Sequence, residues 1–120
     1  MPSTNEETVE RYLDGFRRTD HAQILGCLTD DVVWTVFSAF RLEGKAAYDA
    51  AIEGPGSAGA PDLEVVRMVE EGDTVMAELV GRVPQQDESV QPLSMTEVFV
   101  LREGLIRERR AWVIPLGDPE

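Results

Sequence analysis

Apolar residues recur with a helical period near the start of the chain. Val9, Tyr12, Leu13 and Phe16 occupy positions i, i+3, i+4 and i+7, which places them on one face of a helix over about residues 4–18. A serine and a threonine at the start of this stretch are each followed three residues later by a glutamate. This is the capping-box pattern of a helix start.

Along the rest of the chain, the spacing of apolar residues changes from one typical of helices to one typical of strands. A short second helix is predicted after Asp20, and a third over about residues 45–53. Runs of β-branched and aromatic residues predict strands over about 32–37, 63–69, 74–83, 93–101 and 105–114. Residues 54–61 and 84–92 are predicted as loops. Three helices followed by an antiparallel meander predict one α+β domain over residues 1–120, with the helices on one face of the sheet.

One carboxylate falls on an apolar strand face. Alternation along the strand 93–101 groups Glu97 with Met95 and Phe99 on the face expected to point inward. If residues 102–104 form a three-residue loop, the two last strands pair so that Glu97 lies opposite Arg109. An isolated buried carboxylate is costly, so a partner for Glu97 is expected.

The arginines of the last strand have two interpretations. Arg107, Arg109 and Arg110 either form a solvated strand end paired with nearby glutamates, or Arg109 faces inward. An inward Arg109 would neutralise Glu97 or hold the head of an anionic ligand. Burial among apolar neighbours favours a protonated Glu97, whereas an arginine opposite it favours the ion pair, and the register favours the pair.

Composition narrows the classes of function. The chain carries 11 basic and 23 acidic residues, a net charge of −12, which argues against nucleic acid and anionic membranes as partners. No apolar run is long enough to cross a bilayer, and the N-terminal segment is acidic and polar, unlike a signal peptide. The single cysteine, Cys27, agrees with a reducing compartment. We therefore expect a soluble, cytoplasmic protein.

Four segments in this order and spacing resemble the nuclear transport factor two-like superfamily, which includes ketosteroid isomerases, limonene epoxide hydrolases and SnoaL-like polyketide cyclases. The segments are Val9–Leu13, Cys27–Trp34, Glu71–Val75 and Thr96–Ile106. The resemblance covers nearly the whole chain. It implies a cone, in which a strongly curved sheet is closed by three helices around an apolar pocket, and which often dimerises through the outer face of the sheet.

The resemblance also assigns individual residues. Tyr12 corresponds to the ketosteroid isomerase tyrosine that donates to the dienolate oxygen, and Glu97 corresponds to the second acid of that oxyanion hole. The proton-shuttling aspartate corresponds to Val36, which cannot carry a proton. The epoxide hydrolase set corresponds to Trp34, Val36, Leu79, Gly81 and Ala111. Neither set of acids and bases is complete in this chain.

Inward apolar positions predict the pocket wall. Its expected residues are Phe16, Trp34, Val36, Leu79, Met95, Phe99 and Ala111. Tyr12 either completes the core or presents its hydroxyl to a ligand. The one histidine, His21, lies in a polar stretch and is expected at the surface, and no spacing of ligands suggests a metal or a cofactor.

Two classes of function stay open. One is a domain that binds a small apolar molecule without catalysis. The other is an isomerase, cyclase or hydrolase acting on a small apolar carbonyl or polyketide-like substrate, with Tyr12, Glu97 and Arg109 as its catalytic residues. In either case we expect a homodimer, because the outward positions Val80, Val98, Val100 and Trp112 are too apolar for a solvated sheet face.

Overall fold

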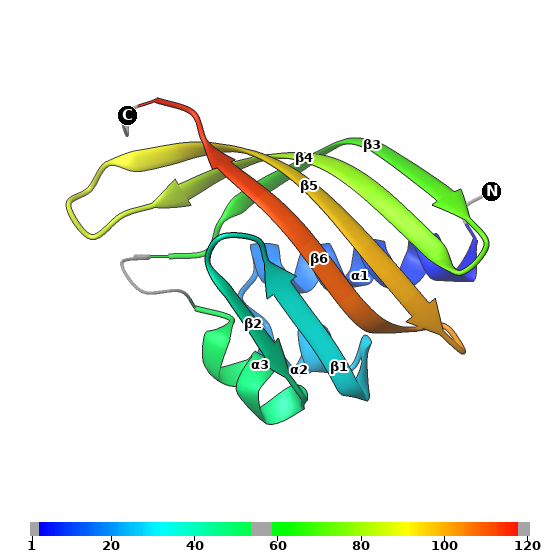
Figure 1. The fold of residues 1–120 in the computed structure, drawn as a ribbon. Helices are drawn as coiled ribbons and strands as arrows, with labels where there is room; N and C mark the ends of the chain where they lie inside the picture. Colours follow the sequence, from blue (N-terminus) through cyan, green and yellow to red (C-terminus); the bar gives the residue numbers. More distant parts are fainter. Residues whose placement is uncertain (1–2, 54–58, 118–120) are drawn as a thin grey trace.

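A strongly curved six-stranded sheet wraps around a long helix in the computed structural model, which describes residues 3–53 and 59–117 (Figure 1). The helices are α1 (Thr4–Arg17), α2 (His21–Leu25) and α3 (Lys45–Ala51). The strands are β1 (Leu28–Val36), β2 (Phe40–Glu43), β3 (Asp62–Glu71), β4 (Thr74–Pro84), β5 (Val90–Arg102) and β6 (Leu105–Pro115), in the sheet order β2-β1-β6-β5-β4-β3. The predicted α+β architecture is confirmed.

Helix α1 lies against the concave face of the sheet and begins at the predicted capping box. The Ser3 hydroxyl accepts from the backbone N–H of Glu6 at 3.0 Å, and the Glu6 carboxylate accepts from the backbone N–H of Ser3 at 3.2 Å. The predicted apolar stripe is buried, with Tyr12 fully inaccessible. At Gly15 a Cβ would lie 2.9 Å from Cγ1 of Ile24, so the glycine allows α2 to pack closely against α1.

Three features of the sheet differ from the sequence prediction. Strand β2 was not predicted, because it is a short edge strand that is largely exposed and shows no apolar alternation. Strand β1 pairs with β6 in parallel, so the sheet is not purely antiparallel. The predicted loop 84–92 is shorter, since Val83 pairs with Gln91 and Pro84 pairs with Val90. Of the predicted loop 54–61, residues 54–58 lie outside the described residues.

The register between β5 and β6 also differs from the prediction. Arg102 pairs with Leu105, and the two residues between them, Glu103 and Gly104, both have positive φ (54° and 79°), as in a two-residue hairpin turn. The register then shifts, so that Leu101 pairs with Ile106 whereas Val100 pairs with Glu108. The extra residue, Arg107, is a β-bulge that lets both Ile106 and Arg109 point inward.

The outer face of the sheet is partly apolar. Val80 and Trp112 are exposed by 39% and 40%, whereas Val98 and Val100 are only 6% and 7% exposed. The two valines pair with Arg110 and Glu108, whose side chains form an ion pair at 3.0 Å, and long side chains of this kind shield the apolar atoms beside them. No helix in the described part of the chain combines the length and apolar character needed to cross a bilayer.

Candidate functional site

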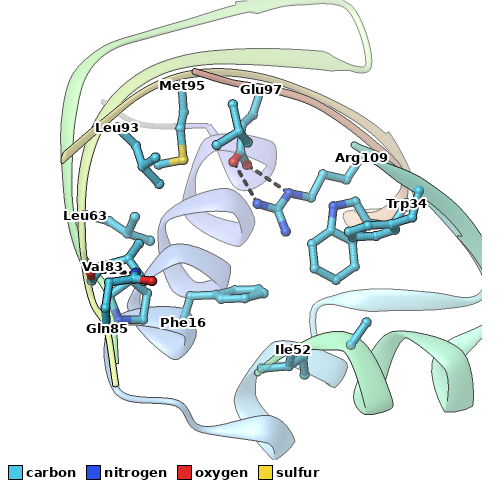
Figure 2. Close-up of a pocket in the computed structure, with 14 residues that line it drawn as sticks. Phe16, Trp34, Ile52, Leu63, Val83, Gln85, Leu93, Met95, Glu97 and Arg109 are labelled. Carbon is cyan, nitrogen blue, oxygen red and sulfur yellow. Dashed lines mark hydrogen bonds and ion pairs between the residues drawn. The ribbon is translucent and has the colours of Figure 1, made fainter. Parts of the chain in front are cut away.

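A cavity of about 310 Å³ lies between the concave face of the sheet, the last turn of α1 and the end of α3 (Figure 2). It sits where β3 and β5 begin and where β4 and β6 end, and its volume is at the low end of small-molecule pockets. Its wall is mostly apolar. The lining residues are Phe16, Trp34, Phe40, Ala51, Ile52, Pro61, Leu63, Val83, Gln85, Leu93, Met95, Glu97, Arg109 and Val113.

Glu97 and Arg109 form a buried ion pair at the inner end of the cavity. Their side chains are 1% and 9% exposed. Nε of Arg109 donates to Oε1 of Glu97 at 2.9 Å, and Nη2 donates to Oε2 at 2.7 Å, so both carboxylate oxygens are engaged. Arg109 is paired in register with Phe99, two residues from Glu97, and it reaches the carboxylate diagonally on the same face of the sheet. The prediction that Glu97 and Arg109 lie directly opposite each other was therefore wrong, although their side chains do form the expected ion pair.

Two buried tyrosines extend this pair toward the helices. Nη1 of Arg109 donates to the Tyr12 hydroxyl at 2.5 Å, and that hydroxyl is in turn hydrogen-bonded to the hydroxyl of Tyr48 on α3. Both tyrosines are fully inaccessible, and burial raises the pKa of each phenol. The two hydroxyls therefore stay protonated at neutral pH. The network joins α1, α3, β5 and β6 through four side chains.

Arg109 is held among aromatic rings. Its guanidinium carbon lies 4.6 Å from the ring centre of Trp34, 5.2 Å from that of Phe16 and 5.3 Å from that of Tyr12. Burial is the largest single effect and disfavours the charge, but the Glu97 carboxylate and the phenols of Tyr12 and Tyr48 together outweigh it, so the pKa of Arg109 lies well above its usual value. The guanidinium is thus a permanent cation whose charge is balanced within the site.

Trp34 contributes a polar atom without a partner. Its ring stacks on Tyr48 with centres 4.5 Å apart and an angle of 25° between the planes. Its indole nitrogen is buried and has no hydrogen-bond partner among the described residues. Buried donors of this kind are rare in folded proteins, because an unmade hydrogen bond is costly. The indole nitrogen is enclosed by protein atoms, so in this conformation a ligand in the cavity does not reach it.

The structure separates the predicted site residues into two groups. Tyr12, Glu97 and Arg109 are hydrogen-bonded together, and Phe16, Trp34 and Met95 line the cavity with the ion pair. Leu79, Phe99 and Ala111 are buried on the inner side of the sheet but do not line the cavity, and the half-buried Val36 does not line it either. Phe99 packs instead against Tyr12 of α1, with ring centres 5.5 Å apart, so this part of the concave face is filled by the helix.

Several site residues were missed by the sequence prediction. Leu63, Val83, Leu93 and Val113 line the cavity, and they continue the predicted inward faces by one or two steps toward the same end of the sheet. The alternation of the strands predicts that these residues point inward. It does not show where α1 stops covering the sheet, and therefore which inward residues line the cavity. Tyr48 was not predicted as a site residue, and nothing in the local pattern shows that its hydroxyl reaches Tyr12.

The positions that carry acids and bases in the isomerase and hydrolase comparisons are apolar here. Val36, Leu79, Gly81 and Ala111 supply no titratable group. Within residues 3–53 and 59–117, no group of histidines, cysteines and carboxylates is placed to hold a metal ion. What the described site offers is an apolar wall and a balanced ion pair that carries hydrogen-bond donors.

The comparisons with known proteins agree with this fold. Residues 9–109 match the family of SnoaL-like domains. An LEH-like epoxide hydrolase from M. tuberculosis has 19% identity and a TM-score of 0.82 over 92% of this chain and 82% of its own. An NTF2-like protein of unknown function from Burkholderia pseudomallei has 19% identity and a TM-score of 0.81, covering 91% and 89%.

A third solved structure is SalBIII, described as an epoxide hydrolase/cyclase-like enzyme in pyran ring formation in salinomycin. It has 18% identity and a TM-score of 0.81, covering 91% of this chain and 89% of its own. No protein of curated function matches this chain in sequence. At these identities the structural likeness shows the fold alone.

Proposed function

Because the chain belongs to the family of SnoaL-like domains, within the NTF2-like superfamily, we propose that its cavity binds one small, largely apolar molecule. The observation that carries this proposal is the composition of the wall: of the 14 lining residues, only Gln85, Glu97 and Arg109 are polar or charged. Pockets of this kind gain affinity from apolar burial and orientation from a few polar groups.

Binding without catalysis is the function that the site supports best. A general acid or base must exchange a proton with its substrate, but both oxygens of Glu97 are engaged by a guanidinium. The Tyr12 hydroxyl accepts from Arg109 and is bonded to Tyr48, so it is turned toward the protein and not toward the cavity, which it does not line. The apolar residues at Val36 and Ala111 leave no alternative acid at the expected positions.

Catalysis is the second candidate function, and Arg109 is the residue that supports it. A buried guanidinium at the end of an apolar cavity can stabilise negative charge that develops on a substrate oxygen. In that case Arg109, and not Tyr12 or Glu97, would contact the reacting atoms.

The indole N–H of Trp34 offers a direct test of binding. The chain has two tryptophans, and Trp112 lies on the outer face, so a Trp112→Phe variant identifies the Trp34 resonance in a ¹H–¹⁵N spectrum. Titration with 2-acetylnaphthalene should shift the Trp34 resonance in a saturable manner and leave that of Trp112 in place.

The matched control fills the cavity. Ala51→Phe places a large side chain on the partly buried last turn of α3, where Ala51 lines the cavity. This variant should fold and should bind the probe at least about tenfold more weakly, because the apolar area gained by the probe is lost. A folded Ala51→Phe protein that binds as tightly as the unmodified protein would contradict the proposed site.

A further inference from the structure

The described residues at the inner end of the cavity offer hydrogen-bond donors, and their acceptor oxygens are already engaged by Arg109. Both oxygens of Glu97 accept from Arg109, and the Tyr12 hydroxyl also accepts from Arg109. A guanidinium has two N–H groups on each terminal nitrogen, and Nη2 uses one of them on Glu97. Figure 2 shows the guanidinium projecting into the cavity with Glu97 on one side of it. The second N–H of Nη2 is not used on Glu97.

Trp34 lies on the same wall, against the guanidinium. It neighbours Arg109 in the register between β1 and β6, and the guanidinium carbon lies 4.6 Å from its ring centre. Its indole N–H is the buried polar group without a partner among the described residues. The remaining polar residue of the lining, Gln85, donates its amide nitrogen to the Val83 carbonyl and belongs to the opposite wall (Figure 2).

The charge of this end is already balanced. Glu97 and Arg109 are the charged residues of the lining, and they are joined by two hydrogen bonds at 2.9 and 2.7 Å. A carboxylate ligand would have to lose its hydration in an apolar cavity without a net positive charge to compensate it. A neutral oxygen acceptor can take a spare N–H of Arg109 without that cost.

We propose that Glu97 is the specificity-determining residue of the cavity: by neutralising Arg109, it selects uncharged ligands that carry an acceptor oxygen, such as a ketone, ester or ether, over carboxylates. This inference rests on the proposed binding function. It assigns Glu97 a role as the internal counter-ion of Arg109, and not as an acid that donates to the ligand.

Three naphthalene probes of similar size test the proposal on the intact chain. They are 2-acetylnaphthalene, which is neutral with an acceptor oxygen, 2-naphthoate, which is anionic, and 2-ethylnaphthalene, which has no acceptor. Titration of the Trp34 resonance should give 2-acetylnaphthalene the tightest binding, by about tenfold over each of the others, the worth of one charge-assisted hydrogen bond.

The variant Glu97→Gln tests the cause of this ranking. It leaves Arg109 charged and without a counter-ion. The affinity for 2-naphthoate relative to that for 2-acetylnaphthalene should therefore rise by about tenfold or more. If this variant does not fold, Glu97→Met/Arg109→Met removes both charges, and the preference for the ketone over 2-ethylnaphthalene should disappear.

The outcomes separate this inference from the proposed function. Binding of 2-naphthoate to the unmodified protein as tightly as the ketone, or equal binding of the ketone and 2-ethylnaphthalene, overturns the inference and leaves the binding function standing. An unchanged ranking in the folded variants also overturns it. If none of the three probes shifts the Trp34 resonance, the proposed function itself is wrong.

Discussion

Arg109 is the residue on which the site depends, and its burial is costly by itself. Moving an ion out of water costs several kcal/mol, and attraction to a partner repays this only when the geometry is good and the other donors are also used. Glu97 supplies the geometry and Tyr12 takes a further donor, while three aromatic rings lie against the guanidinium. The ion pair is therefore expected to be stable only as a unit.

This expectation can be measured with a double-mutant cycle. Glu97→Met or Arg109→Met alone should lower the free energy of unfolding by about 3–5 kcal/mol, because each leaves a buried charge without its partner. The double variant should lie within about 2 kcal/mol of the unmodified protein, since an apolar pair of similar volume restores a neutral core. Urea denaturation measures the free energy of unfolding of the unmodified protein, the two single variants and the double variant. If the loss in the double variant equals the sum of the two single losses, the pair does not act as a unit.

The identities of these residues were predictable, but their geometry was not. Alternation along the strand placed Glu97 inward, and the cost of a buried carboxylate pointed to an arginine on the neighbouring strand. The predicted register failed for two reasons: the hairpin turn has two residues and not three, and Arg107 forms a bulge that no sequence pattern in the hairpin indicates. The reach of a long arginine side chain absorbed the error of two residues, so the pair was found although the pairing was wrong.

At the scale of elements, a histidine on α2 joins that helix to α3 and the residues that follow it. Nδ1 of His21 lies 2.5 Å from a carboxylate oxygen of Asp49 on α3, and Nε2 lies 3.1 Å from one of Glu53, just after that helix. Hydrogen bonds to Asp49 and then Glu53 raise the pKa of His21 above its ordinary value. Helix α3 carries Ala51, which lines the cavity, so this bridge helps to hold one wall in place.

The bridge predicts a pH dependence of defined sign. Because the pKa of folded His21 is raised, its stabilising contribution is present below the ordinary histidine value of about 6.5 and is lost as the pH rises through the raised value. The unmodified protein should therefore exceed His21→Gln in urea midpoint more at about pH 5.5 than at about pH 9. An equal difference at both pH values would show that the histidine adds nothing by being protonated.

The elements themselves were predictable to different degrees, for physical reasons. Helix α1 has both a cap and an apolar stripe, two local signals that agree, and it begins within one residue of the prediction. Strand β2 has neither signal, because an edge strand gains its order from pairing with β1 and not from its own side chains. The cavity lies where α1 ends and the sheet continues, which is a property of packing between elements and not of either pattern.

At the scale of the whole molecule, the outer face of the sheet carries a cluster of exposed apolar side chains. Phe37 stacks on Trp112 with ring centres 4.7 Å apart, and Met76, Val80 and Ile114 are exposed by 47%, 39% and 58%. Exposed patches of this kind on a sheet commonly mark a contact with another protein surface. We propose a second copy of the chain as that surface, because two-fold pairing is the commonest way to bury one patch.

This proposal predicts a mass of twice 13.3 kDa in sedimentation at micromolar concentration. Trp112→Glu should shift the protein toward 13.3 kDa, because it replaces a large apolar side chain of the patch with a charge. Ala47→Glu adds the same charge to an exposed position on α3 and should leave the mass unchanged. A monomer in the unmodified protein would exclude the proposed dimer.

Two methionines allow the most direct test of where a ligand binds. Met95 lines the cavity, whereas Met76 is exposed on the outer face, where it lines a second hollow of about 320 Å³ with Arg67, Val69 and Thr96. In protein labelled with ¹³C in the methionine methyl groups, bound 2-acetylnaphthalene should give nuclear Overhauser contacts to the Met95 methyl and the Trp34 indole proton. Contacts to the Met76 methyl without contacts to Met95 would place the ligand on the outer face and contradict binding inside the cone.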